Sequence, residues 1–224
     1  MRLWRRNRSR ERKEIQRKLP RKDKYMGSRR MRGFSLLELM VVVTIILMVS
    51  GVAIMGLQPA MQAGRVTNAY NITLAAIRQT RDFAVGQRQQ YSVTFSNATT
   101  PNTITITQTG NGTVVTTYQL PTDVAYTVVA GIPTAANAVP DGFGAGATAI
   151  GFDQGVAGGV QNVIYFMPDG TAQDINGNLN NGVIYIARAG QLYSSHAITV
   201  WGATGRMRGW QLYNKTGTAY WRQN

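Results

Sequence analysis

The residues from Arg29 to Gly51, RRMRGFSLLELMVVVTIILMVSG, combine a basic patch, a Gly-Phe pair and one carboxylate at the start of an apolar run. The carboxylate belongs to Glu38, and an ionised side chain at the centre of a bilayer costs about 2.5–3.5 kcal/mol on insertion scales. Glu38 lies four residues after Phe34, so the two share one face of a helix. The pattern therefore predicts either a cationic partner for Glu38 or a carboxylate that reaches the membrane interface.

A second group of reactive side chains lies near the C-terminus. No Asp or Glu follows Asp174, whereas five basic residues do: Arg188, Arg206, Arg208, Lys215 and Arg222. Such a surplus can contact the phosphates of nucleic acids. Arg206 and Arg208 are two residues apart, which places them on one face of a strand. Five aromatic residues offer stacking faces, although aromatic residues in strands usually pack: Trp201, Trp210, Tyr213, Tyr220 and Trp221.

The side-chain combinations that catalysis requires are missing. His196 is the only histidine, there is no cysteine, and no Ser/His/Asp set is recognisable, so we expect neither an enzyme nor a cofactor. We expect His196 on a strand, facing solvent or packed beside Tyr193. The loop DINGNLNNG, at Asp174–Gly182, resembles a calcium loop, but Leu179 replaces its Gly and Tyr185 its Glu. An Asn/Gly-rich connection without a metal is the simpler interpretation.

The charge of the chain is concentrated at one end. The 224 residues carry a formal net charge of +14 and include no cysteine, which excludes disulfides and thiol chemistry. Residues 1–33 contain 15 of the 24 basic and 3 of the 10 acidic side chains, and therefore carry +12. The rest carries only +2, which weakens any interpretation of the whole chain as a nucleic-acid-binding protein. The length suits one domain with an appendage.

The apolar run from Leu39 to Leu57 is long enough to cross a membrane. About 19 residues span roughly 28 Å of helix, close to the hydrocarbon thickness of a bilayer. The flanking charge is all N-terminal, so the positive-inside rule leaves the N-terminus in the cytoplasm. The alternatives are a cleaved secretory signal, which the length of the run disfavours, and a twin-arginine signal at 28–34, which Glu38 disfavours. Met26 and Met31 are alternative start sites to Met1.

We expect one long helix that continues past the apolar run. Pro59 should kink or interrupt it. From residue 59 to residue 89 the pattern is amphipathic, with apolar residues at spacings of three and four: Val66, Tyr70, Leu74 and Ile77. The helix would thus have a membrane half, 34–58, and a half, 59–89, that packs on a domain.

From residue 90 to residue 224 the sequence favours strands. We expect an antiparallel set at 91–95, 103–120, 124–129, 162–170, 182–188, 195–203 and 206–213. Gly110-Asn111-Gly112 is a hairpin signal, and Pro168-Asp169-Gly170 is a turn in which the glycine supplies a positive φ. Residues 130–160, rich in Gly, Ala and Pro, should form a long loop with one short strand. The predicted fold class is α+β, a long N-terminal helix packed on an antiparallel β-sheet.

The segment RGFSLLELMVVVTIILMVSGVA resembles the N-terminus of type IV pilins and pseudopilins. Gly33 ends a basic leader, Phe34 follows it, and Glu38 is the fifth residue counted from Phe34. Three further segments resemble both the H-type minor pseudopilins of type II secretion and the FimT-like minor pilins of type IV pili: Ala75–Phe95, Tyr165–Ala172 and Ala197–Trp210. The loop at 130–160 and the unusually long leader resemble nothing in these families.

The resemblance implies that a prepilin peptidase cuts between Gly33 and Phe34 and methylates the new amino group. Residues 1–33 would be removed, and the apolar helix would remain as the single-pass anchor of an inner-membrane protein with a periplasmic domain. The subunit would then enter a pilus or pseudopilus near its tip. Its partners would be other pilins and an inner-membrane assembly platform. Glu38 would pair with the Phe34 amine of a neighbouring subunit, because a charge inside an apolar bundle needs a partner.

Two alternatives remain. Some FimT-like minor pilins use a C-terminal Gly-Arg-x-Arg motif to bind DNA during natural transformation, and Gly205–Arg208 matches this motif. The match implies DNA contacts by Arg206 and Arg208, and the surplus of basic residues adds Lys215 as a candidate. In H-type pseudopilins, by contrast, the Gly-Arg pair serves hairpin geometry. The other alternative is an unprocessed, membrane-anchored extracytoplasmic β domain that keeps its leader.

Overall fold

The structure is a computed structural model that describes residues 33–144, 148–152 and 162–224. The chain divides into two compact units, Met1–Ser50 and Gly51–Asn224. The predicted leader up to residue 32, its alternative start sites and parts of the loop predicted at 130–160 lie outside the described residues.

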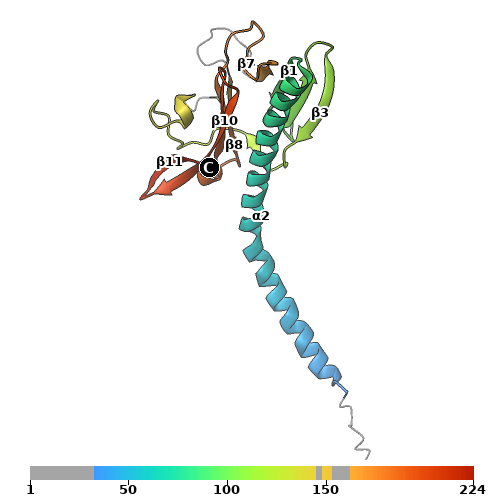
Figure 1. The fold of residues 1–224 in the computed structure, drawn as a ribbon. Helices are drawn as coiled ribbons and strands as arrows, with labels where there is room; N and C mark the ends of the chain where they lie inside the picture. The colour runs from blue at the N-terminus through green and yellow to red at the C-terminus, as the bar shows by residue number, and fades with distance from the viewer. Residues whose placement is uncertain (1–32, 145–147, 153–161) are drawn as a thin grey trace, which may run out of the picture. The chain divides into compact units, whose positions relative to one another are not determined.

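Helix α2 spans Leu36–Gln87 and is the longest element of the chain (Figure 1). It continues through Pro59, so of the two expected effects, a kink or an interruption, the interruption does not occur. A proline inside a helix removes one backbone hydrogen bond and costs about 3 kcal/mol. The helix tolerates this local loss because the residues on both sides of Pro59 continue the hydrogen-bond ladder.

The described residues of the first unit form the N-terminal part of α2, and their apolar side chains are all exposed. The exposed fraction is 77% for Leu36, 55% for Ile45 and 73% for Met48. By length and composition α2 is able to cross a membrane, and none of its most apolar window is buried within the structure. This surface therefore requires an apolar environment that the described residues do not supply.

In the second unit, the C-terminal half of α2 packs through the face that the sequence pattern predicts. Val66, Tyr70, Leu74 and Ile77 are all buried. Two buried threonines on the same face satisfy their hydroxyl groups within the helix, since Thr73 donates to the Ala69 carbonyl at 2.8 Å and Thr80 to the Ala76 carbonyl at 2.7 Å. The buried face of the helix belongs to one apolar cluster with residues of two sheets.

The first sheet has the strand order β3-β2-β1-β6-β7 and is antiparallel throughout. Its strands are β1 (Tyr91–Ser96), β2 (Thr103–Gln108), β3 (Thr113–Gln119), β6 (Val163–Phe166) and β7 (Ala172–Gln173). The predicted hairpin is present: Gly112 has a φ of 68° between β2 and β3. Val93 lies opposite Ile106 on one side and Ile164 on the other, which joins segments far apart in sequence.

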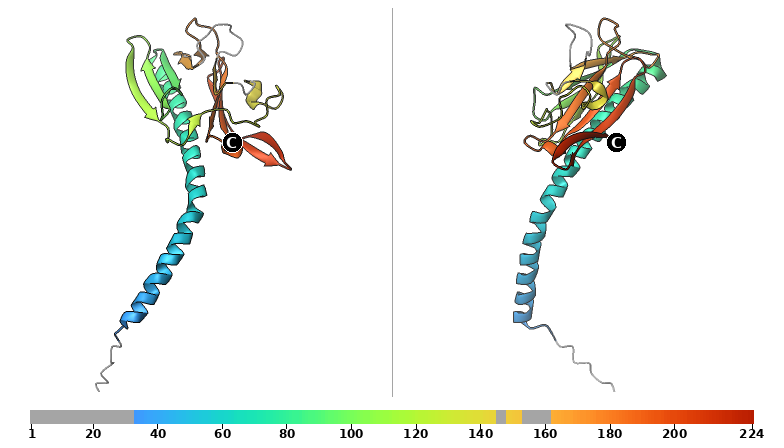
Figure 2. Two further views of the ribbon diagram at one scale, coloured as in Figure 1. Left: turned by 180° about the vertical axis from the view of Figure 1, so that it is seen from behind. Right: turned by 90° about the vertical axis from the view of Figure 1, so that its left-hand side faces the viewer.

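The second sheet has the order β11-β10-β9-β8-β4, with β5 also paired to β8. Its strands are β4 (Ala125–Tyr126), β5 (Ile150–Phe152), β8 (Gly182–Ala187), β9 (His196–Trp201), β10 (Arg206–Lys215) and β11 (Thr218–Gln223). Two short 3-10 helices, η1 (Pro140–Gly142) and η2 (Leu192–Ser194), lie in the connections. The two sheets lie on either side of the C-terminal half of α2 (Figure 2).

The α+β fold class is confirmed, and the differences concern the strands. The pattern did not predict β7 or β11, and β4 is shorter than the expected strand at 124–129. The antiparallel strands divide between two sheets, which the sequence did not indicate because alternation identifies strands but does not determine their partners. The two sheets share one core, in which Ile77 of α2, Phe95 of β1 and Ile198 of β9 all belong to the same apolar cluster.

Gly209→Ala is expected to destabilise the second unit. An added Cβ atom would lie 1.6 Å from the Tyr70 hydroxyl oxygen and 2.7 Å from the ring carbon Cζ. Overpacking of this kind lowers the free energy of unfolding by about 1–3 kcal/mol, which urea denaturation of the full chain in detergent measures. Gly110→Ala is the matched control, because its Cβ would meet no atom within 4 Å. Equal unfolding free energies for the two variants would show that Tyr70 does not press on this strand.

Candidate functional site

The N-terminal candidate residues lie within one turn of each other. Gly33 and Phe34 precede α2, and Glu38 lies in its first turn. The Leu39 amide donates to the Ser35 carbonyl at 3.1 Å, which starts the helical ladder. The helix dipole favours a carboxylate at this end, typically by about 0.3–1 kcal/mol. Glu38 therefore lies in the first turn of the helix, four residues after Phe34 in the sequence.

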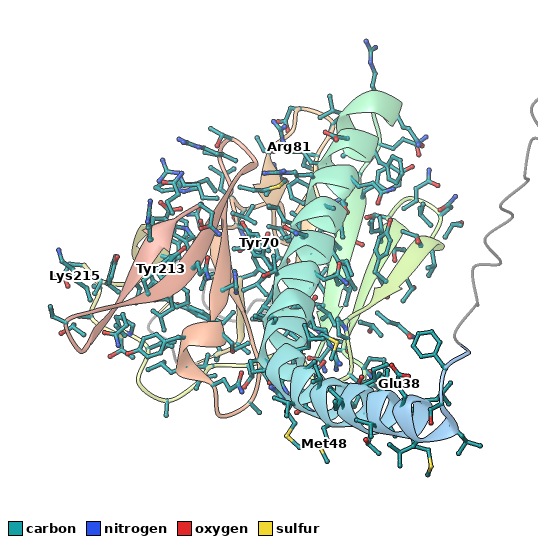
Figure 3. All side chains as sticks on the ribbon, turned by 90° about the horizontal axis from the view of Figure 1, so that it is seen from below. Glu38, Met48, Tyr70, Arg81, Tyr213 and Lys215 are labelled. Carbon is teal, nitrogen blue, oxygen red and sulfur yellow. The ribbon has the colours of Figure 1, made fainter. Side chains whose placement is uncertain are left out.

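Phe34 and Glu38 are both open to their surroundings. Phe34 is 79% exposed, Glu38 is exposed, and no atom lies within 4 Å of a Cβ built on Gly33. Among the described residues, the ion pairs involve other side chains, so Glu38 has no charged partner there. A carboxylate within an exposed apolar surface is suited to a partner from outside the chain (Figure 3).

The three C-terminal residues predicted to contact DNA do not form one site. Arg206 is exposed at the start of β10, and Lys215 is exposed at its end, nine residues further along the strand, or about 30 Å. Arg208 is only partly exposed, because its guanidinium forms an ion pair with the buried carboxylate of Asp141. The structure thus leaves Arg206 and Lys215 free to bind at separate places and compensates the charge of Arg208.

Asp141 is a residue that the sequence analysis missed, and it joins the loop before β5 to the second sheet. Its Oδ1 accepts from Arg208, and its Oδ2 accepts from the Thr199 hydroxyl at 2.5 Å and from the Trp201 indole N–H at 3.2 Å. The Asp141 backbone has a φ of 53°, which is uncommon for a residue other than glycine. No sequence pattern indicates this contact, because 58 positions separate Asp141 from Thr199.

The aromatic residues near Arg208 are engaged by the same loop. The rings of Phe143 and Trp201 have centroids 4.8 Å apart, and the Trp210 indole N–H donates to the Thr199 hydroxyl at 3.1 Å. Tyr213 packs on Tyr220 at the far end of β10, with the guanidinium carbon of Arg222 5.6 Å from the Tyr213 ring centroid. Most of the predicted stacking faces therefore contact other parts of the chain.

The loop at Asp174–Gly182 satisfies its own carboxylate. Asp174 is 4% exposed and accepts from the backbone amides of Asn176 and Asn178 at 2.9 and 2.8 Å, and from the Asn178 side chain at 3.1 Å. Desolvation raises the pKa of the Asp174 carboxyl, but these hydrogen bonds outweigh it and leave the pKa below its ordinary value. The described residues contain no group of three or more His, Cys, Asp or Glu side chains that could hold a metal ion. The geometry favours a structural loop over a calcium site.

The Pro168-Asp169-Gly170 turn has the predicted geometry. Gly170 has a φ of 84°, and Asp169 Oδ1 accepts from both the backbone amide and the hydroxyl of Thr171, at 2.8 and 2.7 Å. These hydrogen bonds lower the pKa of the exposed Asp169 carboxyl. The turn positions the Gly170 carbonyl against α2.

His196 is the first residue of β9, as the sequence predicts, and it is buried rather than facing solvent. It is 5% exposed, its ring centroid lies 5.1 Å from that of Tyr70, and its Nδ1 lies 2.9 Å from the Ser194 carbonyl oxygen. It also borders a cavity of about 380 Å³ between α2 and η2. Desolvation lowers the pKa of His196, although the hydrogen bond to Ser194 opposes this effect.

The comparisons with known proteins point to the N-terminal site. Residues 28–54 match the family model described as the prokaryotic N-terminal methylation motif. No curated protein sequence matches the chain. Among solved structures, the type IV minor pilin FimU of Pseudomonas aeruginosa (strain PAO1) aligns with 10% identity and a TM-score of 0.40, covering 73% of this chain and 95% of that one. The function proposed below therefore rests on the N-terminal motif and not on this distant structural likeness.

Asp141→Asn is expected to lower the free energy of unfolding by about 1–3 kcal/mol, because it leaves the Arg208 guanidinium without its charged acceptor. Asp82→Asn, at an exposed helix carboxylate, is the matched control and should change it by less than about 0.5 kcal/mol. Urea denaturation measures both. The addition of Arg208→Gln to Asp141→Asn should recover part of the loss. A loss from Asp141→Asn no greater than that from Asp82→Asn would disprove the role of this pair.

Burial of His196 should make the protein less stable in mild acid. Because desolvation lowers the pKa of His196 in the folded chain, the unfolded chain takes up the proton first as pH falls. The stability that the neutral ring contributes is complete above the ordinary value of 6.5 and decreases below it. Unfolding free energies at about pH 7.5 and about pH 5.5 should differ more for the wild type than for His196→Gln. A single imidazole NMR titration with a midpoint at or above 6.5 would contradict this.

Proposed function

We propose that this chain, which carries the prokaryotic N-terminal methylation motif found in type IV pilins, is a minor pilin or pseudopilin subunit. A prepilin peptidase cuts it between Gly33 and Phe34 and methylates the new amino group. The observation that carries the proposal is the spacing of Gly33, Phe34 and Glu38 at the start of an exposed apolar helix. The protein acts in filament assembly, and in secretion where the filament is a pseudopilus.

The exposed apolar surface of the helix fits two environments that the subunit occupies one after the other, the membrane and then the filament. Before assembly, α2 anchors the subunit in the bacterial inner membrane with its N-terminus cytoplasmic and its β domain periplasmic. After extraction, the same side chains pack against the helices of neighbouring subunits near the tip of the filament. Full burial of one large aliphatic side chain contributes about 1.5–3 kcal/mol, so a filament core compensates for the loss of the lipid.

Glu38 and the cut at Phe34 act together in this proposal. Cleavage removes a strongly basic leader and creates one amine at the edge of the apolar surface. A carboxylate and an amine that enter an apolar bundle separately would each be costly, whereas a pair is tolerated. Glu38 therefore binds the Phe34 amine of a neighbouring subunit, which aligns that subunit along the filament.

The assembly machinery differs between the two systems in which such subunits occur. A type II secretion pseudopilus and a type IV pilus both use an inner-membrane assembly platform and other pilins as partners. Genes beside this one distinguish them, since a secretion channel accompanies the first and pilus or competence genes accompany the second. An unprocessed, membrane-anchored β domain is the remaining alternative, and it predicts that the leader stays on the mature chain.

DNA binding is a second candidate function, and the exposure of Arg206 favours it. Arg206 follows Gly205 and forms no ion pair among the described residues. No acidic residue follows Asp174, so the C-terminal strands attract polyanions. In this role the subunit captures DNA for natural transformation from its position in the filament.

Processing is tested by producing the chain in a host that has a prepilin peptidase. Mass spectrometry of the membrane fraction should find a chain that begins at N-methylated Phe34. Gly33→Leu should block the cut because the proposed peptidase cuts after a glycine, and a bulky side chain at this position would not fit a peptidase site shaped for one. No atom of the described chain crowds a side chain at this position, so the variant should leave the subunit itself unstrained. A mature chain that retains residues 1–33 would refute the proposal and favour the unprocessed alternative.

Glu38→Gln should leave the cut intact and reduce incorporation into filaments by about tenfold or more. Loss of a charged hydrogen bond of about 1.5–3 kcal/mol accounts for this reduction. Immunoblots of sheared filaments against the membrane fraction measure it. Glu38→Asp keeps the charge on a shorter side chain and should incorporate at an intermediate level. Equal incorporation of Glu38→Gln and the wild type would exclude the pairing.

DNA binding is tested with the chain from Phe34 onward in detergent, so that the leader charge is absent. Fluorescence anisotropy with a labelled duplex should show binding that weakens steeply between about 50 and 200 mM salt, because bound phosphates release counterions. Absent binding, or binding that salt does not change, would eliminate this candidate function and leave the pilin proposal intact.

A further inference from the structure

A groove bordered by three arginines lies where α2 meets the turn between β9 and β10. Its volume is about 450 Å³, and its lining comes from two segments: Arg78, Arg81 and Asp82 of α2, and residues 204–207 of the turn and β10. Figure 3 shows Arg81 on α2 on the side that faces the strands of the second sheet. The two segments are more than a hundred positions apart in sequence, so only the fold brings these charges together.

Arg81 is held in place by two backbone carbonyls. Its Nε donates to the Gly170 carbonyl at 3.2 Å, and its Nη2 donates to the Thr204 carbonyl at 3.3 Å. Gly205 closes the floor of the groove, since its φ is 59° and an added Cβ would lie 2.1 Å from the Gly170 carbonyl oxygen. Neutral acceptors orient a guanidinium without cancelling its charge, so Arg81 is a fixed positive charge at the back of the groove.

Arg78 and Arg206 form the two sides of the groove and remain uncompensated. Both side chains are exposed, and neither forms an ion pair within the described part of the chain. By contrast, Arg65 and Arg188 share Asp123, and Arg208 is paired with Asp141. Asp82 is the single acidic residue of the lining, which leaves three positive charges against one negative charge.

We propose that this groove binds the phosphodiester backbone of DNA, with Arg78 and Arg206 as the contacting residues and Arg81 as a fixed charge behind them. The inference rests on the second candidate function and adds α2 to its binding surface. The planar fork of a guanidinium donates two hydrogen bonds to one phosphate, which favours a phosphate over a simple anion. An open groove with charges on both sides suits a polymer that passes through it.

The position of the groove disfavours a membrane phosphate as its ligand. Arg78 lies 21 residues beyond Leu57 on α2, where the apolar run ends. At 1.5 Å per residue this separation is about 30 Å, far beyond the Debye length of roughly 8–10 Å. Lipid headgroups at the end of the apolar run therefore do not reach these arginines.

Two variants with equal charge changes test the proposal on the chain from Phe34 onward in detergent. Arg78→Gln/Arg206→Gln removes the groove contacts, and Arg88→Gln/Arg222→Gln removes two exposed charges that do not line the groove. The probe is a labelled duplex of about 30 base pairs. The groove variant should bind about tenfold more weakly per arginine, and the slope of log affinity against log salt should decrease by about 2. The control variant should change both quantities much less.

The other possible results of this experiment each contradict a different part of the proposal. If the two variants lost the same DNA affinity, the binding would be a general electrostatic attraction, and the groove would not be the DNA-binding site. Wild-type binding that neither variant weakens would overturn the groove while DNA binding stands. An absence of wild-type binding would remove the groove together with the DNA-binding function, but not the pilin proposal. Binding of anionic phospholipid vesicles, but not DNA, through Arg78 and Arg206 would overturn the choice of ligand. Arg78→Lys/Arg206→Lys, which keeps charge and fold, should retain intermediate affinity.

Discussion

The close approach of the Tyr70 ring on α2 to Gly209 on β10 is the contact on which the packing of the helix on the second sheet depends. Gly209 leaves room for the Tyr70 ring, and a side chain at position 209 would clash with it. Tyr70 in turn covers His196 on β9, so the hydrophobic face of the helix closes over the second sheet. Without this approach, the apolar residues shared by α2 and both sheets would not form a single core.

Polar contacts at the edges of this core hold the long connections in place. Arg81 joins α2 to two turns through backbone carbonyls, and Asp141 joins the loop before β5 to β9 and β10. Both are partly buried charges with several hydrogen bonds, which is the condition under which such charges are stable. The same contacts decide which arginines remain available. The charge of Arg208 is paired with Asp141, whereas Arg206 remains exposed at the groove.

Charge and apolar surface are divided along the chain in a way that fits the proposed order of events, in which the leader is removed before the apolar helix assembles. Most of the +14 net charge lies in the first 33 residues, which the proposed cut removes. The apolar half of α2 then presents an exposed surface with one carboxylate at its start, while the β domain carries its own buried core. The proposed membrane anchor, whose side chains also form the proposed filament core, thus precedes the folded domain along the sequence, and the core of that domain uses different side chains.

The sequence by itself determined the local features of this protein. Each of these features follows from residue types at short spacings. They are the Gly33-Phe34 junction, Glu38, the apolar run, the buried face at Val66, Tyr70, Leu74 and Ile77, and the turns at Gly112 and Gly170. Tertiary structure decided what depends on contacts between distant segments: the division of the strands between two sheets, the burial of His196, the pairing of Arg208 with Asp141, and the meeting of Arg78 with Arg206. Periodicity reports which face of an element is apolar, but the partner of a strand or a charge depends on how the elements pack together.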